Sequence, residues 1–216
     1  MPTIDPQQSW RRVRRWLWIA AGSVAAIGLG ALAWSASQKP PVGAADAAAS
    51  YASAIGGPFT STDTNGKAFS SAQLKGKPFA IFFGFTRCPD VCPTTLSRMA
   101  QLRKQLGADR DKFSIVFVTV DPQRDTPAEM ANYVGLFGTP IIGLSGTSAQ
   151  TAQAVKAYHV FYAKVPTGPG DYTIDHTATI FLMDAKGGFS GTIAHDEAQN
   201  VALEKLKNLI DRKSVV

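Results

Sequence analysis

Cys88 and Cys92 are the only cysteines of this chain, and they stand four residues apart. An apolar run, Phe79 to Phe83, precedes them, and leucines with a methionine at helical spacing follow them. The pattern predicts a buried strand that ends at a pair of thiols, just where a helix begins. Thiolates at a helix N-terminus are suited to soft-metal binding or to thiol–disulfide exchange.

Several kinds of chemistry fit this pair of thiols. The positive end of the helix dipole and the nearby Arg87 favour thiolate, and four-residue spacing on a helical turn places both sulfurs on one face, which suits Cu(I). A reversible disulfide is the alternative, although redox pairs usually have two residues between the cysteines and this pair has three. A purely structural disulfide is less favoured, because so small a loop restricts few unfolded conformations.

Three histidines are available as further ligands. His176 lies just before a strand of the expected final hairpin, and in a thioredoxin-like order that segment packs beside the cysteine loop, so we expect it to be a ligand. His159 falls within a predicted strand, and His195 falls within a polar loop before the last helix. We expect neither of these two to bind metal.

Two aspartates, Asp121 and Asp125, follow the second apolar strand, at the same sheet edge as the cysteines. One interpretation is a turn and a helix cap, since Thr126 and Pro127 come next. The other is that the carboxylates orient site residues or face a partner. The sequence supports both equally. It contains no phosphate-binding glycine loop and no serine on a recognisable nucleophile turn.

The surrounding elements predict an α/β fold. Asn65-Gly66 marks an N-terminal hairpin. The strand at 78–85, the helix after it and the strand at 113–120 form a parallel βαβ unit. The further predicted elements are helices from 127 to 137 and from 148 to 158, strands at 140–144 and 159–165, a hairpin of 177–183 with 188–193, and a helix around 201–210. This is a thioredoxin-like order with inserted elements.

The N-terminal part predicts a single transmembrane helix before this domain. Residues 16–36 carry no charge, and about 20 such residues span the roughly 30 Å of bilayer hydrocarbon. Four arginines between positions 11 and 15 predict a cytoplasmic N-terminus, residues 1–15. Residues 37–56 are expected to be a linker, and residues 57–216 the domain outside the membrane. A cleaved signal peptide and a mitochondrial presequence are the alternatives.

The charge distribution argues against nucleic-acid binding. Half of the net charge of +6 lies in the first 15 residues, where the arginines serve membrane topology. The remainder is only mildly basic, which leaves no electrostatic footprint for a nucleic acid.

Three motifs, in order, carry a resemblance to a known family. They are Gly84-Phe85-Thr86-Arg87-Cys88-Pro89-Asp90-Val91-Cys92-Pro93, Val120-Asp121-Pro122-Gln123-Arg124-Asp125-Thr126-Pro127 and Asp175-His176-Thr177. Together they closely resemble the Sco/SenC family of copper chaperones for cytochrome c oxidase. The resemblance covers about residues 57–210.

The resemblance implies a thioredoxin-like domain that binds copper, as Cu(I) and also as Cu(II), through Cys88, Cys92 and His176. It implies either copper delivery to the dinuclear copper centre of an oxidase subunit or reduction of that subunit's cysteines. Other copper chaperones and thiol reductants are the further expected partners. The expected location is the bacterial inner membrane, as a single-pass protein with its C-terminal domain in the periplasm.

Two other functions compete with a metallochaperone. A membrane-tethered thiol–disulfide reductase would use Cys88 and Cys92 as catalytic thiols without an obligatory metal. A peroxiredoxin-like peroxidase usually places its attacking cysteine in a Thr-x-x-Cys setting, whereas Thr94 and Thr95 follow the cysteines in this chain.

Overall fold

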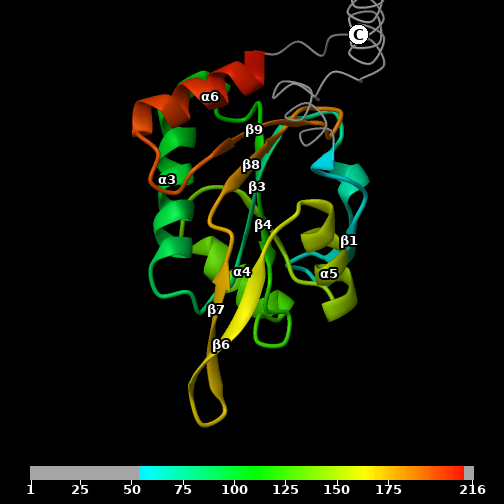
Figure 1. Cartoon of the computed structure of the whole chain (residues 1–216). Helices are drawn as coiled ribbons and strands as arrows, with labels where there is room; N and C mark the ends of the chain where they lie inside the picture. The colour runs from blue at the N-terminus through cyan, green and yellow to red at the C-terminus, as the bar shows by residue number, and fades with distance from the viewer. Residues whose placement is uncertain (1–53, 212–216) are drawn as a thin grey trace, which may run out of the picture. The chain divides into compact units, whose positions relative to one another are not determined.

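The computed structural model describes residues 54–211, and Figure 1 shows how their elements are arranged. The predicted cytoplasmic segment 1–15 and membrane span 16–36, with nearly all of the linker 37–56, lie outside the described residues. Within residues 54–211, no helix combines the length and the apolar character that crossing a membrane requires.

A five-stranded sheet forms the centre of the domain, in the order β5-β4-β3-β8-β9. Its strands are β3 (Phe79–Gly84), β4 (Ser114–Thr119), β5 (Ile141–Leu144), β8 (Ile180–Met183) and β9 (Phe189–Ile193). β3 pairs in parallel with β4, from Phe79 opposite Ser114 to Gly84 opposite Thr119, and antiparallel with β8. The predicted parallel βαβ unit followed by an antiparallel hairpin is therefore confirmed.

Helices cover this sheet, as Figure 1 shows with α3 and α6 on one side and α5 on the other. They are α3 (Val91–Gln105), α4 (Pro127–Gly135), α5 (Ser148–Ala157) and α6 (Gln199–Asp211), with short 3₁₀ turns η1 (Ser71–Leu74) and η2 (Gly107–Asp109). The Thr126 side chain accepts a hydrogen bond from Glu129 N at the start of α4, and Thr147 and Gln150 form a capping box for α5. Both predicted helix starts are confirmed.

The N-terminal hairpin has the predicted turn. β1 (Thr60–Thr62) and β2 (Ala68–Ser70) pair antiparallel, and Gly66 has φ +75°, which glycine adopts without a steric penalty.

The core lies around β3, all six residues of which are buried. Because this strand is covered on both faces, its sequence is continuously apolar instead of alternating. Its own Phe82 and Phe83 pack in this core together with the buried Phe85 and Phe117. The cysteine turn therefore begins directly after a closely packed strand.

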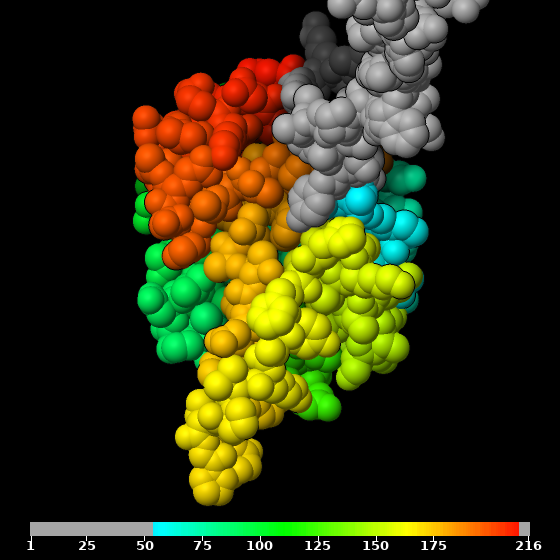
Figure 2. Space-filling view, viewed as in Figure 1, coloured from blue at the N-terminus to red at the C-terminus, as the bar shows by residue number. Residues whose placement is uncertain are grey.

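The segment before the final hairpin differs from the prediction. A strand at 159–165 was expected, but His159 lies in a turn with φ 52°, and the chain forms β6 (Tyr162–Gly168) and β7 (Asp171–His176) instead. The two strands pair antiparallel as a separate ribbon, which projects from the body of the domain in Figures 1 and 2. The predicted strand overlaps β6 at 162–165, whereas β7 was not predicted, because only Ile174 of this strand is buried and no apolar alternation results.

Candidate metal centre

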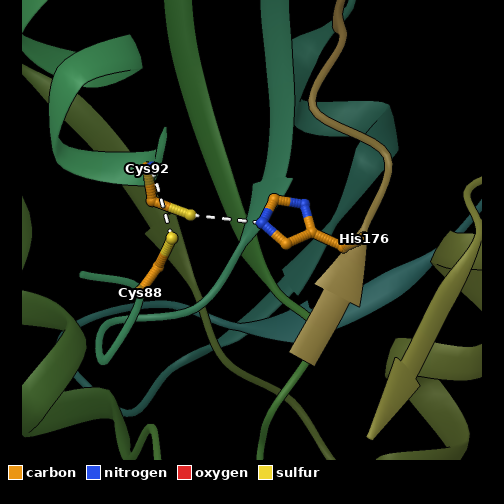
Figure 3. A group of neighbouring side chains, drawn as sticks. All are labelled: Cys88, Cys92 and His176. Carbon is orange, nitrogen blue, oxygen red and sulfur yellow. Dashed lines mark hydrogen bonds between the residues drawn. The ribbon is translucent and has the colours of Figure 1, made fainter. Parts of the chain in front are cut away.

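The cysteine turn joins β3 to α3. Cys92 lies in the first turn of α3 and is fully buried, whereas Cys88 lies before the helix and is half-buried. The predicted helical turn carrying both cysteines is therefore wrong, because α3 begins only at Val91. The sulfurs still come together, since Cys92 N donates a hydrogen bond to Cys88 Sγ at 3.4 Å (Figure 3).

His176 approaches the thiols from the end of β7. Its Nε2 lies 3.4 Å from Cys92 Sγ, and its Nδ1 lies 3.0 Å from the carbonyl oxygen of Thr177. Since a carbonyl oxygen only accepts, this contact places the proton on Nδ1 and leaves the Nε2 lone pair directed at the sulfur. The imidazole also packs edge-on against the rings of Phe82 and Phe85, at 6.0 and 5.8 Å.

The structure brings together the three residues that the sequence singled out. The ligand atoms of Cys88, Cys92 and His176 all lie within 4.8 Å of one another, and within residues 54–211 they are the one such group of histidine, cysteine and acidic side chains. His159 lies elsewhere, with its Nε2 3.2 Å from the Ala54 carbonyl oxygen, and the His195 side chain is 52% exposed. Two sulfurs and one imidazole nitrogen at this separation fit a soft metal ion.

The two thiols have opposite electrostatic character. Hydrogen bonding from Cys92 and, secondarily, contact with His176 lower the pKa of Cys88 to about 4. The same interaction with Cys88, together with burial, raises the pKa of Cys92. The neighbouring thiol and imidazole thus contribute more than Arg87, which is exposed to solvent. Near neutral pH the pair consists of an accessible thiolate and a buried thiol.

Gly84 makes room for the buried sulfur. A Cβ atom at this position would lie 2.6 Å from Cys92 Sγ and 2.9 Å from Phe117 Cε2. In the sequence, Gly84 was named only as the first residue of the cysteine motif, without a role of its own. A glycine at the end of an otherwise bulky apolar strand was the available signal, because it often marks a close approach.

The two aspartates after β4 are both buried, at 1% exposure for Asp121 and 0% for Asp125. Asp125 accepts hydrogen bonds from Thr86 N (3.0 Å), Thr86 Oγ1 (2.6 Å) and Thr119 Oγ1 (2.5 Å). The turn and helix cap and the orienting role therefore both hold, since Thr126 caps α4 while Asp125 fixes the cysteine turn two residues before Cys88.

An open groove of about 330 Å³ lies beside Cys88. The cysteine turn and β7 form its walls, with Phe85, Pro89, Val91, Ile174 and His176 among the lining residues. A partner can therefore reach the Cys88 sulfur from solvent, whereas Cys92 is shielded.

Comparisons with known proteins find a matching family model and several similar structures. The SCO1/SenC family model matches residues 47–211. An SCO2-like protein from Rickettsia conorii is 38% identical over 156 residues, which are 71% of this chain and 76% of the relative. The structure of Bradyrhizobium japonicum ScoI with copper bound is 49% identical in sequence, with a TM-score of 0.67. The match covers 72% of this chain and 99% of the ScoI chain. Yeast Sco1 with copper bound is 32% identical, with a TM-score of 0.69, over 76% of this chain and 92% of its own.

Proposed function

This chain belongs to the SCO1/SenC family, and we propose that it is a membrane-anchored copper-binding assembly factor for cytochrome c oxidase. The observation that carries the proposal is the convergence of Cys88, Cys92 and His176 within 4.8 Å. The copper-bound relatives from Bradyrhizobium japonicum and yeast support copper as the ion.

The ligand set favours copper over zinc. Soft thiolates select Cu(I), and three donors suit a trigonal ion, whereas structural zinc almost always takes four ligands. Cys88 contributes a half-buried thiolate that is open to the groove, while Cys92 and His176 are held against the core. A thiolate of the copper-accepting oxidase subunit, or of another copper chaperone, would therefore replace Cys88 first when copper is passed on.

A second candidate function is reduction of the acceptor's cysteines, which the asymmetry of the thiol pair favours. The Cys88 thiolate would attack an acceptor disulfide and form a mixed disulfide, with one acceptor thiolate leaving. Cys92 would then lose its proton to that thiolate and attack Cys88 Sγ. The second acceptor sulfur leaves as a thiolate and takes a proton from water, so the acceptor becomes a dithiol. Two electrons are transferred, and Cys88–Cys92 becomes a disulfide, which a cellular thiol reductant would reduce again.

One experiment tests the metal proposal and separates the two functions. The whole chain, purified in detergent, reduced and freed of metal by a chelator, is titrated with Cu(I) against an equal amount of Zn²⁺ and analysed by native mass spectrometry. We expect one copper per chain. Stoichiometric zinc uptake with no copper would contradict the proposal, and rapid reduction of a disulfide peptide by the metal-free chain would favour the reductase.

The proposed topology places residues 1–15 in the cytoplasm, residues 16–36 across the bacterial inner membrane, residues 37–56 as a linker and residues 57–216 in the periplasm. The arginines before the uncharged run support this orientation. Protease added to spheroplasts should degrade the domain. A domain that survives this treatment in intact spheroplasts, and is degraded only after lysis, would contradict the proposed location.

A further inference from the structure

The hairpin of β6 and β7 carries His176, and few contacts hold it to the domain. Nearly every residue of β6 is exposed, and Ile174 is the single buried residue of β7. Figure 2 shows the ribbon extending away from the main body. Because His176 is the last residue of β7, the position of its imidazole depends on where this ribbon is held.

Three residues join the turn end of the hairpin to the loop after β4, and we call them the hairpin latch: Asp121, Arg124 and Tyr172. Tyr172 Oη donates a hydrogen bond to Asp121 Oδ1 at 2.8 Å, and Arg124 Nε donates to Asp121 Oδ2. Arg124 Nη1 donates to the Tyr172 carbonyl oxygen at 2.8 Å, and the guanidinium lies 3.7 Å from the centre of the Tyr172 ring. Both the side chain and the backbone of Tyr172 are therefore fixed to the loop after β4.

The same loop also holds the cysteine turn. Asp121 N donates to Thr119 Oγ1 at 2.9 Å, and Thr119 Oγ1 donates to Asp125 Oδ2 at 2.5 Å. Asp125 in turn binds the backbone and side chain of Thr86, as described above. A continuous series of hydrogen bonds thus runs from Tyr172, four residues before His176, to Thr86, two residues before Cys88.

The latch is built from charged groups that are removed from solvent. Asp121 is 1% exposed and the Arg124 side chain 14%. Hydrogen bonds to charged groups in such surroundings are stronger than neutral ones at the surface. Arg124 Nη2, however, is buried without a hydrogen-bond partner, which costs free energy. A buried charge with an unpaired hydrogen-bond donor contributes little net stability, and local costs in free energy of this kind tend to occur at functional sites.

We propose that the hairpin latch is a positioning device, which sets the His176 imidazole against Cys88 and Cys92. Asp121 and Tyr172 are its central residues, because each joins the hairpin to the loop that also fixes the cysteine turn. None of the three latch residues is proposed to touch copper. The effect on copper rests on the proposed function, but the effect on the hairpin does not.

The first test uses the whole metal-free chain with Tyr172→Phe, which removes the hydroxyl and keeps the ring against Arg124. Losing one charge-assisted hydrogen bond should accelerate amide hydrogen exchange across residues 162–176 by about tenfold. Tyr162→Phe is the matched control, since Tyr162 lies opposite His176 in the same ribbon and is exposed. Exchange that is unchanged in Tyr172→Phe, or equally accelerated in the control, would overturn the latch.

The second test asks whether the latch acts through His176. Tyr172→Phe should weaken Cu(I) retention by about tenfold, and it should reduce the thiolate–Cu(II) charge-transfer absorption. In a His176→Ala background the same substitution should have no further effect on retention. An equal loss in both backgrounds would overturn positioning of His176. A parent chain that takes up no copper would instead overturn the proposed function, and hydrogen exchange alone would then decide the latch.

Discussion

The two halves of the candidate metal centre are built in different ways. The cysteine turn follows a strand with six buried residues, and Cys92 has no exposed surface. The hairpin that supplies His176 is an exposed ribbon outside the main sheet. Close packing therefore fixes Cys92, whereas His176 is held by two ring contacts, with Phe82 and Phe85, and by a small number of polar contacts in and around its ribbon.

This difference indicates how the centre can be both selective and open. A donor held by packing moves little, because interiors are close-packed and a displacement loses many contacts at once. A donor at the end of an exposed strand, held by two ring contacts and a few hydrogen bonds, has fewer contacts to lose, so its movement costs less free energy. We therefore expect substitutions in the cysteine half to affect folding, and substitutions in the hairpin half to affect mainly the metal.

The largest effect is expected from Gly84→Ala in the packed half. The added methyl would meet Cys92 Sγ at 2.6 Å and the Phe117 ring at 2.9 Å. Overpacking of this kind lowers the free energy of unfolding by about 1–3 kcal/mol, and displacement of the sulfur should weaken copper binding as well. Chemical denaturation and copper titration measure the two effects.

Gly135→Ala is the control for that substitution. Gly135 ends α4, is exposed, and has no atom within 4 Å of an added Cβ. Alanine there should be neutral or stabilising, by up to about 1 kcal/mol. If both substitutions were equally mild, the cysteine half would be less tightly packed than the structure indicates.

The next largest effect is expected from His176→Ala in the hairpin half. Loss of one of three donors should weaken copper retention by more than about 100-fold, which exceeds the usual cost of losing a group that only orients a ligand. The fold should survive, with a loss of about 1 kcal/mol because the imidazole packs against Phe82 and Phe85. His159→Ala and His195→Ala should leave copper stoichiometry unchanged. If His159→Ala lost copper instead, the proposed ligand set would be wrong.

The packed half and the hairpin half also differ in how well the sequence alone predicts them. The packed half was predictable, because a continuous apolar strand, a helix and a second apolar strand determine a parallel unit, and this unit places the cysteines at its edge. The start of α3 was not, because Asp90 provides no side-chain cap and the helix begins only at Val91. Cys88 was therefore expected on the helix instead of in the turn before it.

The hairpin half was predictable only in part. The residue His176 was identified correctly as a neighbour of the cysteines, but the strand that carries it was missed, since an exposed ribbon has no buried face to create a pattern. Asp121 and Tyr172 are 51 residues apart, and their hydrogen bond is a tertiary contact that no local pattern encodes.

A smaller, chemical effect concerns the pH dependence of the thiols. A group whose pKa is lowered to about 4 is deprotonated above that pH, so alkylation of Cys88 by iodoacetamide should be nearly as fast at pH 6 as at pH 8. An ordinary thiol would react about 75-fold more slowly at pH 6. Cys92, which is buried and has a raised pKa, should remain unmodified in the folded chain. Mass mapping of the alkylated peptides measures both rates. A Cys88 rate that falls between pH 8 and pH 6 as steeply as that of a free thiol would contradict the assignment of Cys88 as the thiolate and Cys92 as the thiol.

The smallest effect is expected on the outer surface of the hairpin. Val165 is 36% exposed in β6, and Val165→Thr keeps a β-branched side chain, so the free energy of unfolding should change by less than about 0.5 kcal/mol. Ile174→Val, at a site that is 4% exposed in the partner strand, should cost about 0.5–1.5 kcal/mol. Denaturation curves of the two variants compare the loss of unfolding free energy at the exposed site, Val165, with the loss at the buried site, Ile174. A loss for Val165→Thr as large as that for Ile174→Val, and dependent on protein concentration, would mean that a second copy of the chain covers the outer surface of the hairpin.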